Sequence, residues 1–175
     1  DHPNGAAFTA YPKLIKLLMD KSFRDGEFEK INKEAQKSSV LGNLKREYSL
    51  YDIAILTRAG PAKVLGLTNI GHLGIGAKAN ITVYNNKEDK EEMFENPFMV
   101  FKDGNLIVKN GKIQKVFNGK FYTAETDFDK KIEKEISSYF QKYMGRGMES
   151  FKIKNQELWD YGIETENIKC DRNDY

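Results

Sequence analysis

The pattern of apolar and polar positions predicts a helical region at the start of the chain. Within residues 11–22, Leu14, Ile15, Leu17, Leu18 and Met19 fall on one stripe of a helix, and Pro12 suits its first turn. Residues 27–37 carry charge on most faces, which predicts a second, more exposed helix that ends at the serines.

A capping pattern predicts where the next helix begins. Ser49 lies three residues before Asp52, so each side chain can bond backbone N–H groups of a first turn, and a helix is expected over 50–58. Gly60 is expected to break that helix, and a short helix is expected over 62–67. The sequence thus predicts two helices that meet at a corner.

Glycines at 71, 74 and 76 precede a segment rich in β-branched and aromatic side chains, residues 80–84. A dinucleotide fingerprint needs the strand before its glycines and a helix after them, so this order argues against nucleotide binding. We expect a tight backbone crossing that leads into a strand.

Three dipeptides that favour two-residue turns predict an antiparallel meander. Asp103-Gly104, Asn110-Gly111 and Asn118-Gly119 each lie between short apolar segments, and such pairs accept the positive φ angles of type I′ turns. The predicted strands are 98–102, 105–109, 112–117 and 120–123.

After the meander, apolar residues at helical spacing predict a long amphipathic helix over 127–144 whose aromatic stripe forms a core or subunit contact. Residues 150–154 are expected to form a short strand. Trp159 and Tyr161 are expected to be buried in the chain's own fold, with an interface role as the alternative.

The balance of charges excludes several kinds of partner. The 175 residues hold 28 Lys and Arg against 26 Asp and Glu, a net charge of +2, so no nucleic-acid or acidic-lipid partner is indicated. No apolar run is long enough to cross a membrane, and the single cysteine, Cys170, cannot form an internal disulfide. A cytoplasmic protein with a spectator thiol is expected.

Candidate catalytic residues are few. The chain has two histidines, His2 and His72, and neither a HExxH motif nor a paired-cysteine motif is present. The one dense polar cluster is the starting sequence DHPNG, residues 1–5, which by itself is typical of a frayed terminus. His72 lies among the glycines and is expected to have a surface or loop-packing role.

The order of three segments nevertheless resembles the last third of amidohydrolase-superfamily enzymes. These segments are DHPNGAAFTAYP, LYDIAILTRAGPAKVLGL and GHLGIGAKANITVYN, and TRAGPAKVLGL, residues 57–67, is the most specific of them. Within the superfamily the long starting motif resembles the A subunits of formylmethanofuran dehydrogenases. The resemblance covers residues 1–123. Residues 124–175 carry no motif that could support or contradict it.

The resemblance implies a metal-dependent enzyme. Family members hold a binuclear centre, usually zinc, at the mouth of a (β/α)8 barrel, and Asp1 matches the aspartate that ends the eighth strand. Asp1 is therefore expected to be both a metal ligand and a catalytic proton acceptor. His2, Pro3 and Asn4 match the motif without an individual role.

The resemblance also implies substrates and partners. The family condenses formate with the amine of methanofuran, reversibly, in the first step of CO2 reduction in archaeal methanogenesis. Partner subunits carry a tungsten or molybdenum pterin and Fe–S clusters. Because the other family ligands are absent, the isolated chain is expected to be inactive and, with open strand edges, prone to associate.

The expected fold is therefore α+β, the C-terminal piece of an amidohydrolase. Residues 1–68 are expected to end the barrel, 69–123 to form part of a β-sandwich with the meander, and 124–175 to form a helical tail. Two alternatives remain open: another amidohydrolase, dihydroorotase-like or D-aminoacylase-like, and a non-catalytic interaction module.

Overall fold

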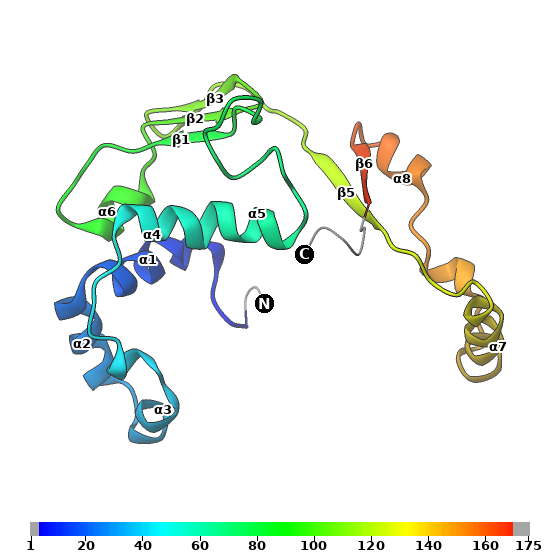
Figure 1. Ribbon diagram of the computed structural model, residues 1–175, viewed down its shortest axis with the longest axis horizontal. Coiled ribbons are helices and arrows are strands. Elements are labelled where there is room, and N and C mark those ends of the chain that lie inside the picture. Colours follow the sequence, from blue (N-terminus) through cyan, green and yellow to red (C-terminus); the bar gives the residue numbers. More distant parts are fainter. Residues whose placement is uncertain (1–3, 170–175) are drawn as a thin grey trace. The chain divides into compact units, whose positions relative to one another are not determined.

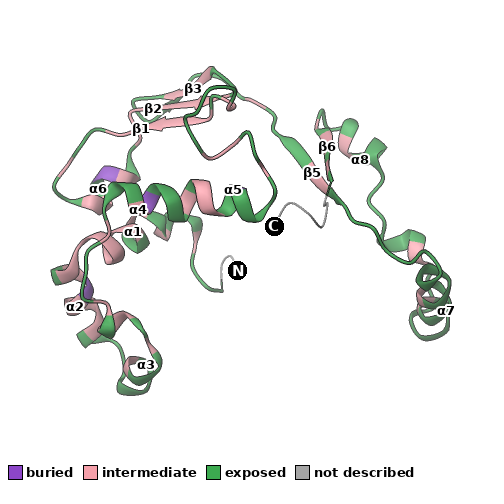
Figure 2. Cartoon of the chain, viewed as in Figure 1, coloured by how far each residue is buried: buried purple, intermediate pink, exposed green. Residues whose placement is uncertain are grey.

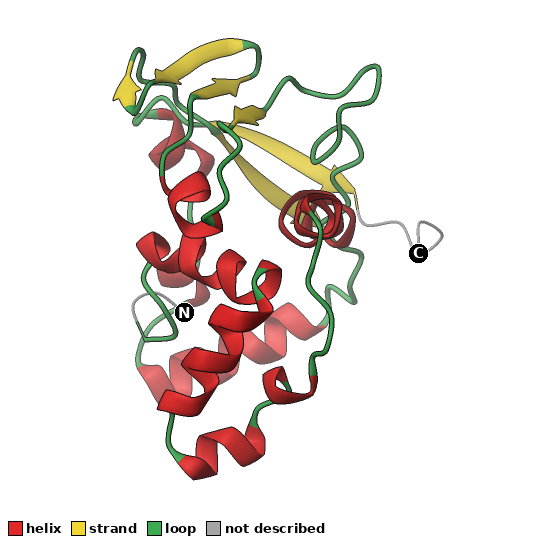
Figure 3. Ribbon diagram, turned by 90° about the vertical axis from the view of Figure 1, so that its left-hand side faces the viewer, coloured by secondary structure: helices red, strands yellow, loops and turns green. Residues whose placement is uncertain are grey.

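The computed structural model describes residues 4–169 (Figure 1). Residues up to Phe117 form one compact unit, and residues from Asn118 onward form a second. Asp1, His2, Pro3 and Cys170 lie outside the described residues. Figure 3 shows that the described part of the chain is mixed helix and strand, in agreement with the predicted α+β class.

The first unit begins with helices whose boundaries are set by polar caps. Helix α1 begins at Tyr11 with proline in its first turn, as predicted, but ends at Met19. The Asp20 side chain then accepts a hydrogen bond of 2.8 Å from the Phe23 N–H and starts the next helix. These elements are η1 (Phe8–Ala10), α1 (Tyr11–Met19), α2 (Lys21–Lys30), α3 (Lys33–Ser38) and η2 (Leu41–Asn43).

The single helix predicted over 27–37 is wrong, because two helices occupy this region. Helix α2 ends at Lys30, Ile31 is extended, and the Asn32 side chain accepts a 2.8 Å hydrogen bond from the Ala35 N–H. An Asn side chain that bonds the backbone in this way starts a new helix in place of continuing the old one.

The predicted break at Gly60 is also wrong. One helical run joins α4 (Leu50–Ala54), the π-helical turn η3 (Ile55–Ala59) and α5 (Gly60–Val64), and Gly60 itself is helical with φ −61° and ψ −57°. Pro61 has no N–H and its ring crowds the carbonyl one turn earlier, and a wider π turn relieves that conflict without ending the helix. The predicted corner is therefore a continuous helix.

A four-stranded antiparallel sheet follows in the order β1-β2-β3-β4. Its strands are β1 (Ile81–Val83), β2 (Met99–Lys102), β3 (Asn105–Lys109) and β4 (Lys112–Ile113), with α6 (Lys90–Glu95) between the first two. Two of the three predicted turns are confirmed, because Asp103 and Asn110 have φ of 46° and 50° and each is followed by a positive-φ glycine. The predicted strand over 112–117 is only two residues long.

The fourth predicted meander strand does not join this sheet. Instead β5 (Lys120–Glu125) pairs in parallel with β6 (Glu164–Lys169) in a separate two-stranded sheet, a strand that sequence reasoning missed in a tail expected to be helical. Among the described residues, Asn118 and Gly119 are not in the positive-φ region, so the third turn is absent. A six-residue partner offers β5 more backbone hydrogen bonds than the two-residue β4.

Helices connect the two strands of the second unit. They are α7 (Ile132–Met144), η4 (Met148–Phe151) and α8 (Asn155–Trp159). The strand predicted over 150–154 is wrong, because Phe151 belongs to a 3-10 turn and its ring packs 4.8 Å, centroid to centroid, from that of Phe140. Trp159 and Tyr161 are 53% and 80% exposed, so their predicted burial in this fold is also wrong.

The core of the described chain is small and lies in the first unit. The buried residues are Ile53, Ala62, Met93 and Arg24, in the few buried segments of Figure 2. No residue between 118 and 169 is buried. Helices α1 and α6 pack together, with an ion pair of 2.6 Å between Lys16 Nζ and Asp89 Oδ2 at their contact.

Candidate functional site

The predicted catalytic cluster lies mostly outside the described residues. This holds for Asp1, the predicted metal ligand and proton acceptor, and for His2 and Pro3. Asn4 and Gly5 are exposed and form a turn that leads into η1, where Phe8 is 70% exposed. The described part of the motif is thus an exposed approach to α1, and Asp1 as a site residue stays a prediction.

The TRAGPAKVLGL segment, residues 57–67, forms the second half of the long helical run and its C-terminal cap. The Gly60 N–H donates to the Ile55 carbonyl five residues earlier, and a Cβ at Gly60 would lie 2.9 Å from that oxygen. The Leu67 N–H donates to the Ala62 carbonyl over 2.8 Å, and Gly66 has φ 69°, which together close the helix in a Schellman motif. Both glycines are therefore required by backbone geometry.

The glycine-rich crossing lies directly against this helix. The predicted tight crossing is confirmed, and the structure adds which element it crosses. A Cβ on Gly71 would lie 2.7 Å from the Arg58 carbonyl oxygen and 2.8 Å from the Ala62 Cβ. Gly71 also has φ 86°, a region that side-chain-bearing residues rarely adopt. Only glycine allows the chain to pass this close to the helix.

His72 is held within the crossing. Its Nδ1 accepts a 3.0 Å hydrogen bond from the Gly74 N–H, which leaves Nε2 to donate to the Thr68 carbonyl over 2.9 Å. Both ring nitrogens are thus used by the loop backbone. The predicted loop-packing role of His72 is confirmed.

Arg24 is a structural residue that the sequence analysis missed. It is 1% exposed, and its guanidinium donates to the backbone carbonyls of Leu17, Leu18, Leu44 and Arg46 over 2.7–3.3 Å. Two of these carbonyls belong to the last turn of α1, where a cation is favoured. No pattern in the sequence distinguishes this arginine from the exposed charges around it.

The perturbed carboxylates serve helix caps and surface ion pairs. Hydrogen bonds from the Ser49 hydroxyl and N–H, followed by Arg46, hold the pKa of Asp52 at about 2, and the Ser49–Asp52 capping box predicted from the sequence is confirmed. Hydrogen bonds from Lys13 and then Lys30 hold the pKa of Glu27 at about 2. A carboxylate that stays ionised in a surface pair is unsuited to proton transfer near neutral pH.

The described residues do not fit a metal centre by themselves. Between residues 4 and 169 no group of three or more His, Cys, Asp or Glu side chains could hold a metal ion. In the same part of the chain no helix is both long enough and apolar enough to cross a membrane. A zinc pair would thus need ligands from outside the described residues, and no catalytic step follows from their geometry.

Comparisons with known proteins identify the scaffold. The sequence profile described as "Amidohydrolase family" matches residues 1–113. The chain is 39% identical over 170 residues to the A subunit of the formyltransferase/hydrolase complex Fhc of Methylorubrum extorquens, covering 97% of this chain and 31% of that protein. It is 36% identical over 186 residues to "Protein FwdA" of Methanocaldococcus jannaschii, covering 99% of this chain and 32% of that protein.

A solved structure agrees with these matches. The crystal structure of the formyltransferase/hydrolase complex FhcABCD from Methylorubrum extorquens with methylofuran contains a chain that matches with a TM-score of 0.78 and 39% identity, over 97% of this chain and 31% of that one. This chain thus spans about a third of the length of the relatives it matches. The resemblance to the A subunits that the sequence predicted is confirmed, and the chain belongs to the amidohydrolase family.

Proposed function

We propose that this chain is the carboxyl-terminal part of the A subunit of an enzyme complex that forms and cleaves the formamide bond of a formyl carrier such as methanofuran. One observation carries the proposal: the similarity of this chain to the Fhc subunit and to FwdA extends over 97–99% of its length. The amidohydrolase profile ends at residue 113, whereas the similarity to these two relatives continues through most of the second unit.

The reaction is an amide hydrolysis and its reverse. Water adds to the formyl carbon, the C–N bond breaks, and formate and the carrier amine are released; condensation runs the same steps backwards. In this proposal, the first unit supports the part of the chain that enters α1 through residues 4–10. Arg24 joins α1 to residues 44–46 and so stiffens this support.

Asp1 is the proposed contribution of this chain to catalysis. A carboxylate at the end of a barrel strand can bind a metal ion and accept a proton, and the resemblance assigns both roles to Asp1. A binuclear zinc centre, with its other ligands elsewhere in the full-length protein, is the proposed cofactor. A partner subunit with a tungsten or molybdenum pterin and Fe–S clusters is proposed only for a complex that also reduces CO2 to formate.

The proposal is tested in the full-length protein, assembled with its partners. Asp1→Asn is expected to lower hydrolysis of the N-formyl carrier by about 100-fold or more, because it removes a proton acceptor and a metal ligand. Glu34→Gln is the control, since the Glu34 side chain is 83% exposed and, among residues 4–169, forms an ion pair only with Lys37 at 2.8 Å. Metal content per protomer is measured in parallel.

Full activity of Asp1→Asn in a correctly assembled complex would refute the role of Asp1. Hydrolysis of a cyclic amide or an N-acyl amino acid, with no activity on the formyl carrier, would favour a dihydroorotase-like or D-aminoacylase-like enzyme instead. The lack of any amidase activity in the full-length protein would favour the interaction module.

A further inference from the structure

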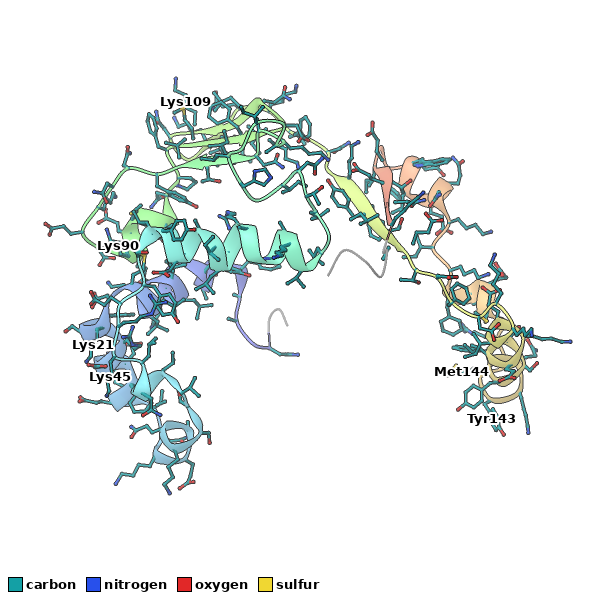
Figure 4. All side chains as sticks on the ribbon, in the orientation of Figure 1. Lys21, Lys45, Lys90, Lys109, Tyr143 and Met144 are labelled. Carbon is teal, nitrogen blue, oxygen red and sulfur yellow. The ribbon has the colours of Figure 1, made fainter. Side chains whose placement is uncertain are left out.

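Helix α7 presents an apolar stripe to solvent. Ile132, Ile136, Tyr139 and Tyr143 recur at intervals of four, three and four residues, which places them on one face. Ile132, Tyr139 and Tyr143 are 49%, 56% and 63% exposed. Figure 4 labels Tyr143 together with Met144 at the end of this helix.

Contacts within the second unit leave this stripe open. The rings of Tyr139 and Tyr143 lie 4.7 Å apart, centroid to centroid, and form a continuous surface along the helix. Phe140 lies beside the stripe and packs against Phe151 of η4. The internal packing of α7 therefore uses the flank at Phe140. In the stripe, Ile132, Tyr139 and Tyr143 are exposed and Ile136 is half-buried.

Charges of opposite sign border the other flank of the stripe. Glu135 and Lys142 are seven residues apart, so both lie on the same side of the helix, at the heptad position before the apolar positions 136 and 143. Lys142 Nζ lies 4.9 Å from the centroid of the Tyr143 ring, at the margin of the stripe. The opposite face is polar, with Lys134, Ser137, Ser138 and Gln141.

We propose that the α7 stripe binds a second copy of this chain, with the two α7 helices antiparallel. In that arrangement Ile136 faces Tyr139 of the second copy, and Ile132 faces Tyr143 of the second copy. The flanks that carry Glu135 and Lys142 then lie side by side with an axial offset of two residues, about 3 Å. Each glutamate meets the other copy's lysine, and the two-fold axis makes two such pairs.

The charge pattern favours a second copy of the chain as the partner and an antiparallel arrangement of the two α7 helices. In a parallel pair, the flank with Glu135 would face the flank with Phe140, and no ion pair would form. In the antiparallel pair, Glu135 of each copy lies opposite Lys142 of the other, so two identical helices have complementary charges. The inference does not depend on the proposed enzymatic function, since it uses only residues of the second unit.

The interface is expected to be weak. A helix of 13 residues is about 20 Å long, and one pair of such helices buries less than the roughly 1,600 Å² of a standard stable interface. A dissociation constant in the micromolar range is therefore expected, and association should weaken as salt screens the ion pairs.

The test is a charge exchange in the full-length protein, measured by sedimentation equilibrium at several concentrations and low salt. Glu135→Lys or Lys142→Glu alone turns both attractive pairs into repulsive ones and should weaken dimerisation by about tenfold. The double exchange E135K/K142E restores opposite charges and should restore the wild-type dissociation constant. Lys134→Glu, on the polar face of the same helix, is the control and should not affect dimerisation beyond the small effect of net charge.

Circular dichroism of each variant verifies that the helix is retained. The proposal is overturned if the wild-type chain is a monomer throughout the micromolar range, if all variants associate alike, or if the double exchange fails to restore dimerisation. It is also overturned if α7 is protected from amide hydrogen exchange only when a different component of the complex is added.

Discussion

The close passage of Gly71 against the TRAGPAKVLGL helix leads to a quantitative prediction for Gly71→Ala. The new Cβ would meet the Arg58 carbonyl oxygen at 2.7 Å and the Ala62 Cβ at 2.8 Å, so backbone atoms must shift. Overpacking of this kind costs about 1–3 kcal/mol. Adoption of φ 86° by alanine adds about 1 kcal/mol, giving a total loss of about 2–4 kcal/mol.

Gly76→Ala is the matched control. Gly76 has φ 88°, almost the same as Gly71, but no atom lies within 4 Å of its Cβ position. Alanine also restricts the unfolded chain in the same way at both sites, so this effect cancels in the comparison. The difference between the two variants, about 1–3 kcal/mol, therefore isolates the close contact.

The assay is amide hydrogen exchange of residues 60–67, combined with urea unfolding followed by far-ultraviolet circular dichroism. Fluorescence is unsuitable, because the single tryptophan, Trp159, lies in the second unit. Equal losses of stability for Gly71→Ala and Gly76→Ala would refute the argument, since they would mean that the crossing does not touch the helix.

Two further predictions concern the charges of the first unit. Arg24→Met removes the guanidinium donors of four backbone carbonyls, of which, among the described residues, only that of Leu18 keeps another donor, the Tyr48 N–H. The variant is expected to lower the free energy of unfolding by on the order of 3 kcal/mol, whereas the same change at the exposed Lys63 should have little effect. Equal thermal midpoints for the two variants would contradict the clamp role of Arg24. The pKa values of Glu27 and Asp52, about 2, lie below their ordinary values of 4.5 and 3.8, so their contribution to stability is present above about pH 4.5 and is lost as the pH falls towards 2. The urea midpoint should fall over this range, and it should fall less in a variant that combines Glu27→Gln with Asp52→Asn; an equal fall would show that these pairs do not contribute.

Local chemistry explains which elements could be predicted. The Ser49–Asp52 cap, the turns at Asp103-Gly104 and Asn110-Gly111 and the first strand all depend on residues within a few positions of one another. The crossing at Gly71 was predicted because an unusual spacing of glycines indicates a close approach of backbone. The boundary at Asn32 was missed because the charged pattern continues through it without a change.

The missed features depend on partners far apart along the chain. Strand β5 looks like a fourth meander strand from its own sequence, but its partner β6 begins 44 residues later. Arg24 looks like a surface charge, and only the assembled fold brings carbonyls from 17–18 and 44–46 around it. Gly60 is an exception with a local cause: it looks like a helix breaker, yet the backbone beside Pro61 widens into a π turn and the helix continues.

By itself, the sequence determined the helical start, the capping box, the two tight turns, the amphipathic character of α7 and the family to which the chain belongs. These features depend on the order of residues within short segments, where side-chain size and hydrogen bonding act locally. The predicted start of α7 at residue 127 is wrong, because the helix begins at Ile132. Tertiary structure alone decided the separate β5–β6 sheet, the burial of Arg24 and the exposure of Trp159. These three features depend on which segments, distant in the sequence, come into contact. Local preferences cannot specify those contacts, because the free energy of burial depends on both surfaces that meet.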